Sequence, residues 1–172
     1  MFANYLLYKN FEEKTIIKAV LHRRGKNMLI RAMTIEDYEE VYQMWQTTSK
    51  RALSRADEKP QMQRYLARNA GMSQVAVIDG KIVGTVLAGH DGRRGFIHHM
   101  AVMPEYRRKH IGHSLAQQAI EKITDEGIEK THIFCYSNNT TGQGFWRNFG
   151  FEKRDDVFVF SFENDKFNEG KD

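Results

Sequence analysis

The most informative segment of the sequence is Met100-Ala101-Val102-Met103-Pro104-Glu105-Tyr106-Arg107-Arg108-Lys109-His110-Ile111-Gly112. It predicts a buried strand, a short basic loop and a helix that begins at about His110. The first N–H groups of a helix have no intrahelical partner, and the helix dipole makes that end attractive to anions. Gly112 permits close backbone approach, and the Arg and Lys side chains can neutralise phosphate oxygens. The stretch predicts a pyrophosphate site, and a plain basic loop before a helix is the alternative.

Two common phosphate-binding motifs are excluded. The sequence contains no G-x-x-x-x-G-K-S/T, so it has no Walker loop. A dinucleotide fingerprint is also excluded, because only one of its glycines is in place.

Apolar periodicity predicts a mixed α/β sheet with the element order β-α-α-β-β-β-α-β-α-β-β. The strands are expected at 28–33, 75–78, 82–88, 96–102, 131–136, 151–153 and 157–162. The helices are expected after the N-cap Thr34, from Pro60 to about Asn69, from about His110 to Gly127, and around 141–148. The turn Asp79-Gly80 predicts antiparallel pairing, whereas the strand at 131–136 follows a helix and is expected to be parallel.

The predicted domain spans 28–162. Residues 1–27 precede it, either as an accessory helix with Ile16, Ile17, Val20 and Leu21 on its apolar side, or as an upstream extension. Residues 163–172 form a charged tail that is expected to fray.

Composition favours one cytoplasmic domain, since 172 residues with 41% hydrophobic content suit a single core. The sole cysteine, Cys135, excludes an intramolecular disulfide and a multi-cysteine zinc site, and no metal is expected. No apolar stretch approaches the ~20 residues that span a bilayer, and no signal-peptide layout is found. The formal charge of +4 indicates an anionic ligand only weakly.

The stretch from Ala101 to Gly112 resembles the acyl-CoA loop of the GNAT acetyltransferase superfamily, whose signature is Gln/Arg-x-x-Gly-x-Gly/Ala. Arg107 and Gly112 match its first and last positions, and His110 replaces the first glycine. The resemblance extends through Asn139 and the segment 144–151, and it covers about 28–162. It implies a splay between the fourth and fifth strands of the predicted domain. It also implies acetyl-CoA as co-substrate.

The resemblance also implies a set of acetyl-CoA contacts. The backbone of the fourth strand would hydrogen-bond the pantetheine arm, the loop would hold the pyrophosphate, and an asparagine and an aromatic residue would contact the cofactor. These residues are Met100, Ala101, Val102, Arg107, Arg108, Lys109, His110, Ile111, Gly112, His113, Ser114, Asn139 and Trp146.

The catalytic groups are less clearly indicated. Many GNAT enzymes use a tyrosine in the late helix as the acid, but Trp146 holds that position here, and an indole N–H is far too weak an acid. His98 is the candidate base, on a strand face shared with Phe96 and Met100, and His99 is expected on the opposite face. The alternatives are His90, Asp91, Glu105 or no dedicated base.

The expected function is acetyl transfer from acetyl-CoA to a primary amine, by direct attack in a ternary complex. A non-catalytic acyl-CoA-binding module is the alternative. Nucleic-acid binding is disfavoured, because no interleaved aromatic surface accompanies the arginines. The expected partner is a small-molecule or peptide amine, whose pocket would include the loop 47–59 with Asp57 or Glu58, and a homodimer is the assembly to test.

Overall fold

The computed structural model describes residues 19–23 and 26–164. Its strands are β1 (Ala19–Arg23), β2 (Lys26–Ala32), β3 (Gln74–Ile78), β4 (Lys81–His90), β5 (Gly95–Val102) and β6 (Thr131–Ile133). Its α-helices are α1 (Tyr38–Thr48), α2 (Lys59–Arg68), α3 (Ile111–Asp125) and α4 (Thr140–Phe149). Single 3-10 turns occur at η1 (Ile35–Asp37), η2 (Lys50–Ala52), η3 (Arg55–Asp57) and η4 (Pro104–Tyr106).

The six strands form one sheet in the order β1-β2-β3-β4-β5-β6. Pairing is antiparallel from β1 to β5 and parallel between β5 and β6. The mixed sheet and the parallel strand that follows α3 confirm the predicted fold class. The chain forms two compact units, Met1–Phe134 and Cys135–Asp172, and the sheet with α1 to α3 belongs to the first.

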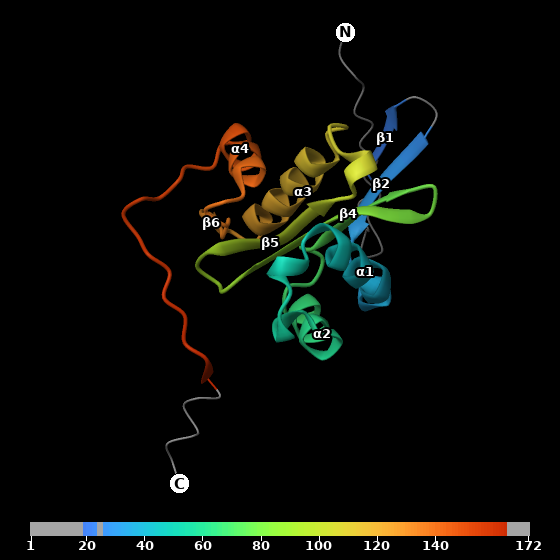
Figure 1. Cartoon of the computed structure of the whole chain (residues 1–172). Coiled ribbons are helices and arrows are strands. Elements are labelled where there is room, and N and C mark those ends of the chain that lie inside the picture. The colour runs from blue at the N-terminus through green and yellow to red at the C-terminus, as the bar shows by residue number, and fades with distance from the viewer. Residues whose placement is uncertain (1–18, 24–25, 165–172) are drawn as a thin grey trace. The chain divides into compact units, whose positions relative to one another are not determined.

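Helices cover both faces of the sheet, with α1 and α2 on one side and α3 on the other (Figure 1). Two neighbouring residues of β4 show this. Thr85 accepts a hydrogen bond from the Trp45 indole of α1 at 2.9 Å. A Cβ on Gly84 would lie only 2.9 Å from Leu115 of α3, so glycine permits α3 to lie close on this strand.

The core between the sheet and α1–α2 contains fully buried Val41, Trp45 and Val75, with Met62 and Ala101 beside them. The helical segment that includes α1 begins after Thr34, as the sequence predicts. Thr34 and Asp37 form the predicted capping box, in which the Thr34 N–H donates to Asp37 Oδ2 at 2.9 Å. Pro60 lies in the first turn of α2, as predicted.

The helical alternative for residues 1–27 is wrong in the part that is described. Ala19–Arg23 is a strand paired along its length with β2, from Ala19 opposite Ile30 to Arg23 opposite Lys26. Its backbone hydrogen bonds therefore go to the sheet edge and not within a helix. Ile16 and Ile17 lie outside the described residues, as do positions 24–25 and 165–172.

The two strands predicted at 151–153 and 157–162 do not form. These residues of the second unit have no regular structure, and Phe158 and Phe160 are 84% and 92% exposed. Apolar β-forming residues raise strand propensity, but a strand needs a paired backbone neighbour, and none is present among the described residues. The strand predicted to reach Tyr136 ends at Ile133 for the same reason.

Candidate active site

The loop between β5 and α3 is shaped for an anion. His110 is the N-cap of α3, with φ 61° and ψ 6°, and its side chain caps nothing. The first bond within the helix runs from the Ser114 N–H to the His110 carbonyl, at 3.0 Å. The N–H groups of the turn before it, from Ile111 on, therefore have no intrahelical acceptor, and the dipole adds positive potential there.

His110 takes the left-handed conformation that suits the glycine found at this position in the family signature. Arg108 also has a positive φ, of 60°. Such conformations cost an L-residue about 1–2 kcal/mol. The loop therefore keeps a glycine-like backbone at His110 without the glycine.

The basic side chains of the loop differ in what they contact. Arg107 Nε donates to the Val102 carbonyl at 2.9 Å. Lys109 Nζ donates to the Glu105 carbonyl at 2.9 Å and lies 5.0 Å above the Tyr106 ring. The Arg108 and His110 side chains are exposed. Arg107 and Lys109 thus stabilise the turn, and Arg108 projects into solvent.

The predicted splay begins after Ile97. Only Gly95, Phe96 and Ile97 of β5 pair with β6. The Met103 N–H bonds the Val83 carbonyl of β4, so strand alternation directs the backbone groups of Met100 and Val102 to the opposite, open edge. Ala101 faces β4, opposite Thr85. The Val102 carbonyl on this edge already accepts Arg107 Nε. The second half of β5 therefore presents the backbone of Met100 and the Val102 N–H to an extended ligand.

A β-bulge in β5 changes the faces on which its histidines lie. Leu87 of β4 pairs with His98 and Thr85 with Ala101, so β5 carries one extra residue, and His99 has φ 41°. His99 stacks on Trp45 of α1 with 4.6 Å between ring centroids. His98 meets Tyr65 of α2 edge-on. Both imidazoles thus point to the α1–α2 side, and the predicted opposite orientation of His99 is wrong.

The His99 imidazole makes a buried contact with the carboxylate of Asp57, the last residue of η3. Nε2 lies 2.7 Å from Asp57 Oδ1, and the two side chains are 10% and 7% exposed. Burial raises the pKa of Asp57, but the hydrogen bonds from His99 and Ser54 outweigh it and hold that pKa below its ordinary value. The sequence predicted Asp57 or Glu58 in the acceptor pocket, but Asp57 is buried against His99, and neither residue lines the cavity described next. The spacing Ser54-x-x-Asp57 of a capping box was the available signal.

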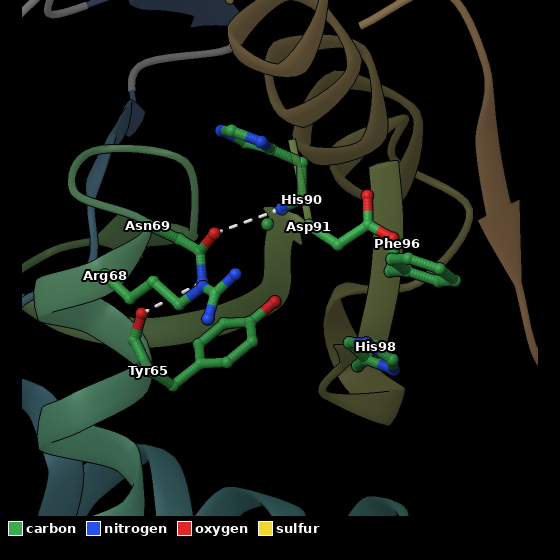
Figure 2. Close-up of a pocket in the computed structure, with 8 residues that line it drawn as sticks. Tyr65, Arg68, Asn69, His90, Asp91, Phe96 and His98 are labelled. Carbon is green, nitrogen blue, oxygen red and sulfur yellow. Dashed lines mark hydrogen bonds between the residues drawn. The ribbon is translucent and has the colours of Figure 1, made fainter. Parts of the chain in front are cut away.

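A cavity of about 190 Å³ opens between α2 and the ends of β4 and β5. Figure 2 shows the side chains that surround it. The lining residues are Tyr65, Arg68, Asn69, Gly89, His90, Asp91, Phe96 and His98. The sequence indicated His98, His90 and Asp91, but neither Tyr65 nor Asn69 belonged to a motif. Glu105 lies on η4 and does not line this cavity.

Asn69 joins the two sides of the cavity (Figure 2). Its Oδ1 accepts the His90 N–H at 3.0 Å, and its Nδ2 donates to the Tyr65 carbonyl at 3.1 Å. A Cβ on Gly89 would lie 2.5 Å from Asn69 Cγ. Glycine at 89 therefore lets Asn69 hold the end of α2 against β4.

His98 has the protonation behaviour of a general base. Burial and the neighbouring His99 lower the pKa of His98. Asp57 raises it, but by less than the other two lower it. The imidazole is consequently neutral at pH 7 with a lone pair available. The rival bases in the cavity have structural partners. His90 Nδ1 accepts the Gly92 N–H, and Asp91 Oδ1 accepts the N–H groups of Arg93 and Arg94.

The second unit contains the two remaining expected contacts. Asn139 caps α4, with Oδ1 accepting the Gly142 N–H at 2.9 Å. Trp146 is 8% exposed and meets Phe145 and Phe151 edge-on, with 4.9 and 5.0 Å between centroids. Burial raises the pKa of the Cys135 thiol, which disfavours a nucleophilic thiolate.

Within the described residues, no three His, Cys, Asp or Glu side chains are grouped as a metal site would need. None of the helices in that part of the chain has the length and apolar character to cross a membrane.

Comparison with known proteins gives one family and many similar folds. Residues 35–151 match the model of the acetyltransferase (GNAT) family. An aminoglycoside N-acetyltransferase, AAC(6')-Iy, solved with CoA, superposes with a TM-score of 0.68 at 20% identity over 83% of this chain and 99% of that one. The PaiA N-acetyltransferase of Thermoplasma acidophilum, solved with coenzyme A, superposes with a TM-score of 0.65 at 21% identity. The match covers 74% of this chain and 91% of that one. Ard1 of Thermoplasma volcanium superposes with a TM-score of 0.64 at 19% identity, over 73% of this chain and 82% of that one. At these identities the solved structures establish the fold.

Proposed function

The chain belongs to the acetyltransferase (GNAT) family, whose model matches more than half of it, and from this membership we propose that it acetylates a primary amine by direct attack in a ternary complex. Acetyl-CoA is the co-substrate of this family. The observation that carries the proposal is the position of His98. It lines the cavity at the point where β5 leaves β6, beside the edge formed by Met100 and Val102.

The proposal includes a set of acetyl-CoA contacts. The first-turn amides of α3, including those of Ile111 and Gly112, would bind the pyrophosphate, with Arg108 beside them. The backbone groups of Met100 and the Val102 N–H would pair with the pantetheine arm, since the Val102 carbonyl already accepts Arg107 Nε. Direct contacts from Arg107, Lys109, His110, His113 and Ser114, and from Asn139 and Trp146 in the second unit, are part of the same proposal.

The reaction needs a neutral amine. His98 accepts a proton from the ammonium, directly or through water, and the freed nitrogen lone pair attacks the thioester carbonyl. The C–N bond forms, the attacking nitrogen releases its second proton to solvent, the C–S bond breaks, and the leaving thiolate takes up a proton. Trp146 cannot supply that proton, so solvent is the proposed donor. Attack by Cys135 is not part of the route, because its pKa is raised by burial.

Release of free CoA with a panel of amines, with mass spectrometry of the acceptor, tests this proposal. We expect CoA release that depends on an amine and a product heavier by one acetyl group. Tight CoA binding without acetylation of any amine, peptide N-termini included, would favour the non-catalytic alternative. The domain span 28–162, the homodimer and the cytoplasmic location remain predictions, to be checked by truncation, light scattering and cell fractionation.

A further inference from the structure

Three nearly parallel rings form an aromatic shelf beside the cavity. It consists of Phe96 and His98 of β5 and of Phe134, which follows β6. The ring of Phe96 lies 6.2 Å from that of His98 at 10°, and 6.3 Å from that of Phe134 at 17°. His98 and Phe134 are also 6.3 Å apart, at 26°. Phe96 and His98 line the cavity, and Phe134 next to them is 62% exposed, so the shelf extends from the cavity wall to an exposed ring.

The opposite wall contains a buried hydroxyl that needs a partner. Tyr65 meets His98 edge-on at 6.3 Å between centroids. Figure 2 shows its hydroxyl end directed towards the strand that carries Phe96 and His98. The hydroxyl oxygen is buried and has no hydrogen bond among the described residues. A buried hydroxyl without a partner is unfavourable, so a bound ligand with a polar group beside it would remove that penalty.

The size and charge of the cavity limit what can bind. A cavity of about 150 Å³ holds one benzene ring, and this one has about 190 Å³. Among the lining residues Asp91 is the single carboxylate, and its Oδ1 already accepts two backbone N–H groups. Arg68, also in the lining, adds a positive charge. A polyamine or an aminoglycoside would need several carboxylates, which this wall does not offer.

We infer that the acceptor is a small monoamine with one aromatic ring, which lies on the shelf of Phe96, His98 and Phe134 and places its amine between the Tyr65 hydroxyl and His98. This inference rests on the proposed function for the identity of the reacting group. Binding of the aromatic ring is inferred from the shelf and the cavity alone, and it can be measured without turnover.

A matched pair of amines separates aromatic stacking from simple apolar burial. We compare 2-phenylethylamine with 2-cyclohexylethylamine, which has the same number of carbons, and with spermidine. Since an aromatic pair contributes about 0.5–1.5 kcal/mol beyond area burial, kcat/KM should favour the phenyl compound by roughly 2- to 10-fold. Equal or better use of the cyclohexyl compound, or a preference for spermidine, would overturn the inference while leaving acetyl transfer intact.

Variants at the exposed ring give the second control. Phe134→Leu should abolish the preference for the phenyl compound, because leucine keeps an apolar contact with both amines but offers no ring to stack on. Phe134→Tyr, which keeps a ring, should retain the preference. Because Phe134 is exposed, neither change should alter the unfolding transition. An unchanged phenyl preference in Phe134→Leu would contradict the shelf.

Binding is measured separately from turnover. Saturation-transfer NMR with CoA present should detect 2-phenylethylamine on the wild-type protein, with a weaker signal on Phe134→Leu. If this binding is seen but no amine is acetylated, the proposed function fails and the ring site stands. If amines are acetylated but binding of 2-phenylethylamine does not depend on Phe134, the inference about the acceptor fails and the proposed function stands.

Discussion

The imidazole of His99 and the carboxylate of Asp57 are joined at 2.7 Å, although 42 positions separate them in the chain. The pair connects the bulge of β5 to the turn before α2. Trp45 completes the arrangement, because it stacks on His99 and donates to Thr85, whose hydroxyl bonds the His99 carbonyl at 3.2 Å. The cavity wall formed by α2 is therefore attached to the strand that carries His98.

Replacing Asp57 by Asn should lower the free energy of unfolding at pH 7. Hydrogen bonds to charged groups contribute about 1.5–3 kcal/mol, and that is the expected loss. The folded pKa of Asp57 is lowered, so its contribution is complete above the unfolded value of about 3.9 and is lost as the pH falls through the folded pKa. Urea unfolding at several pH values measures this.

The control for that experiment is Glu39→Gln. Glu39 is 70% exposed and pairs with Lys59 at the surface, so its replacement should change stability by less than about 0.5 kcal/mol. If Asp57→Asn is no more destabilising than this control at pH 7, then the buried pair does not stabilise the turn.

Gly112→Glu should weaken CoA binding about 10- to 100-fold, because it adds bulk and a negative charge where the pyrophosphate is expected. Calorimetry with CoA is the measurement. Gln117→Glu adds the same charge on the exposed side of α3 and should leave the affinity unchanged. Equal affinities for the two variants, both folded by circular dichroism, would place the pyrophosphate elsewhere.

His110→Gly should be tolerated, and His110→Val should not. A left-handed backbone costs an L-residue about 1–2 kcal/mol, which glycine avoids, while its greater unfolded-state freedom offsets about 0.5–1 kcal/mol. The Gly variant should therefore gain up to about 1 kcal/mol, and the β-branched Val should lose stability. If urea midpoints for Val and wild type coincide, the loop does not hold φ 61° in solution.

Trp146→Phe should keep its turnover within about threefold at saturating acetyl-CoA and lose roughly 0.5–3 kcal/mol of stability, because the ring mainly packs against Phe145 and Phe151. Trp146→Tyr introduces a phenol at the family's acid position and should raise the rate. A severe loss of turnover in a folded Trp146→Phe variant would assign the indole N–H a direct role.

Local signals predicted much of this fold. Thr34 with Asp37, Pro60, Gly80 and Gly127 each act over a few residues, and the elements begin or end there as expected. The start of α3 near His110 was predictable for the same reason. Hydrophobic alternation placed β5, and the parallel β6 followed from the helix between them.

Three features depended on distant partners and could not be predicted in this way. The bulge at His99 leaves no trace in the alternation of Phe96 to Val102, since it arises from how β4 aligns with β5. Asp57 is polar within a polar loop, and only the folded chain brings it to His99. The segment 157–162 has strand propensity, but propensity does not supply a paired neighbour.

The last prediction concerns His98 as the general base. The acceptor arrives as an ammonium ion, and His98 must be neutral to take its proton. Burial and His99 lower the pKa of His98, so kcat/KM should rise with pH through a value below about 6.5 and then level off. His98→Ala should reduce kcat/KM by about 10²–10⁴-fold and remove this acidic limb.

His90→Ala is the matched control, because it removes an imidazole from the same cavity whose Nδ1 already accepts the Gly92 N–H. It should keep the acidic limb and most of the rate. His99→Ala removes the contact with Asp57, so it should mainly lower the free energy of unfolding and leave the acidic limb in place. If His98→Ala retains both its rate and its acidic limb, His98 serves only as part of the aromatic wall. The base is then His90 or Asp91, or the amine loses its proton to solvent before it binds.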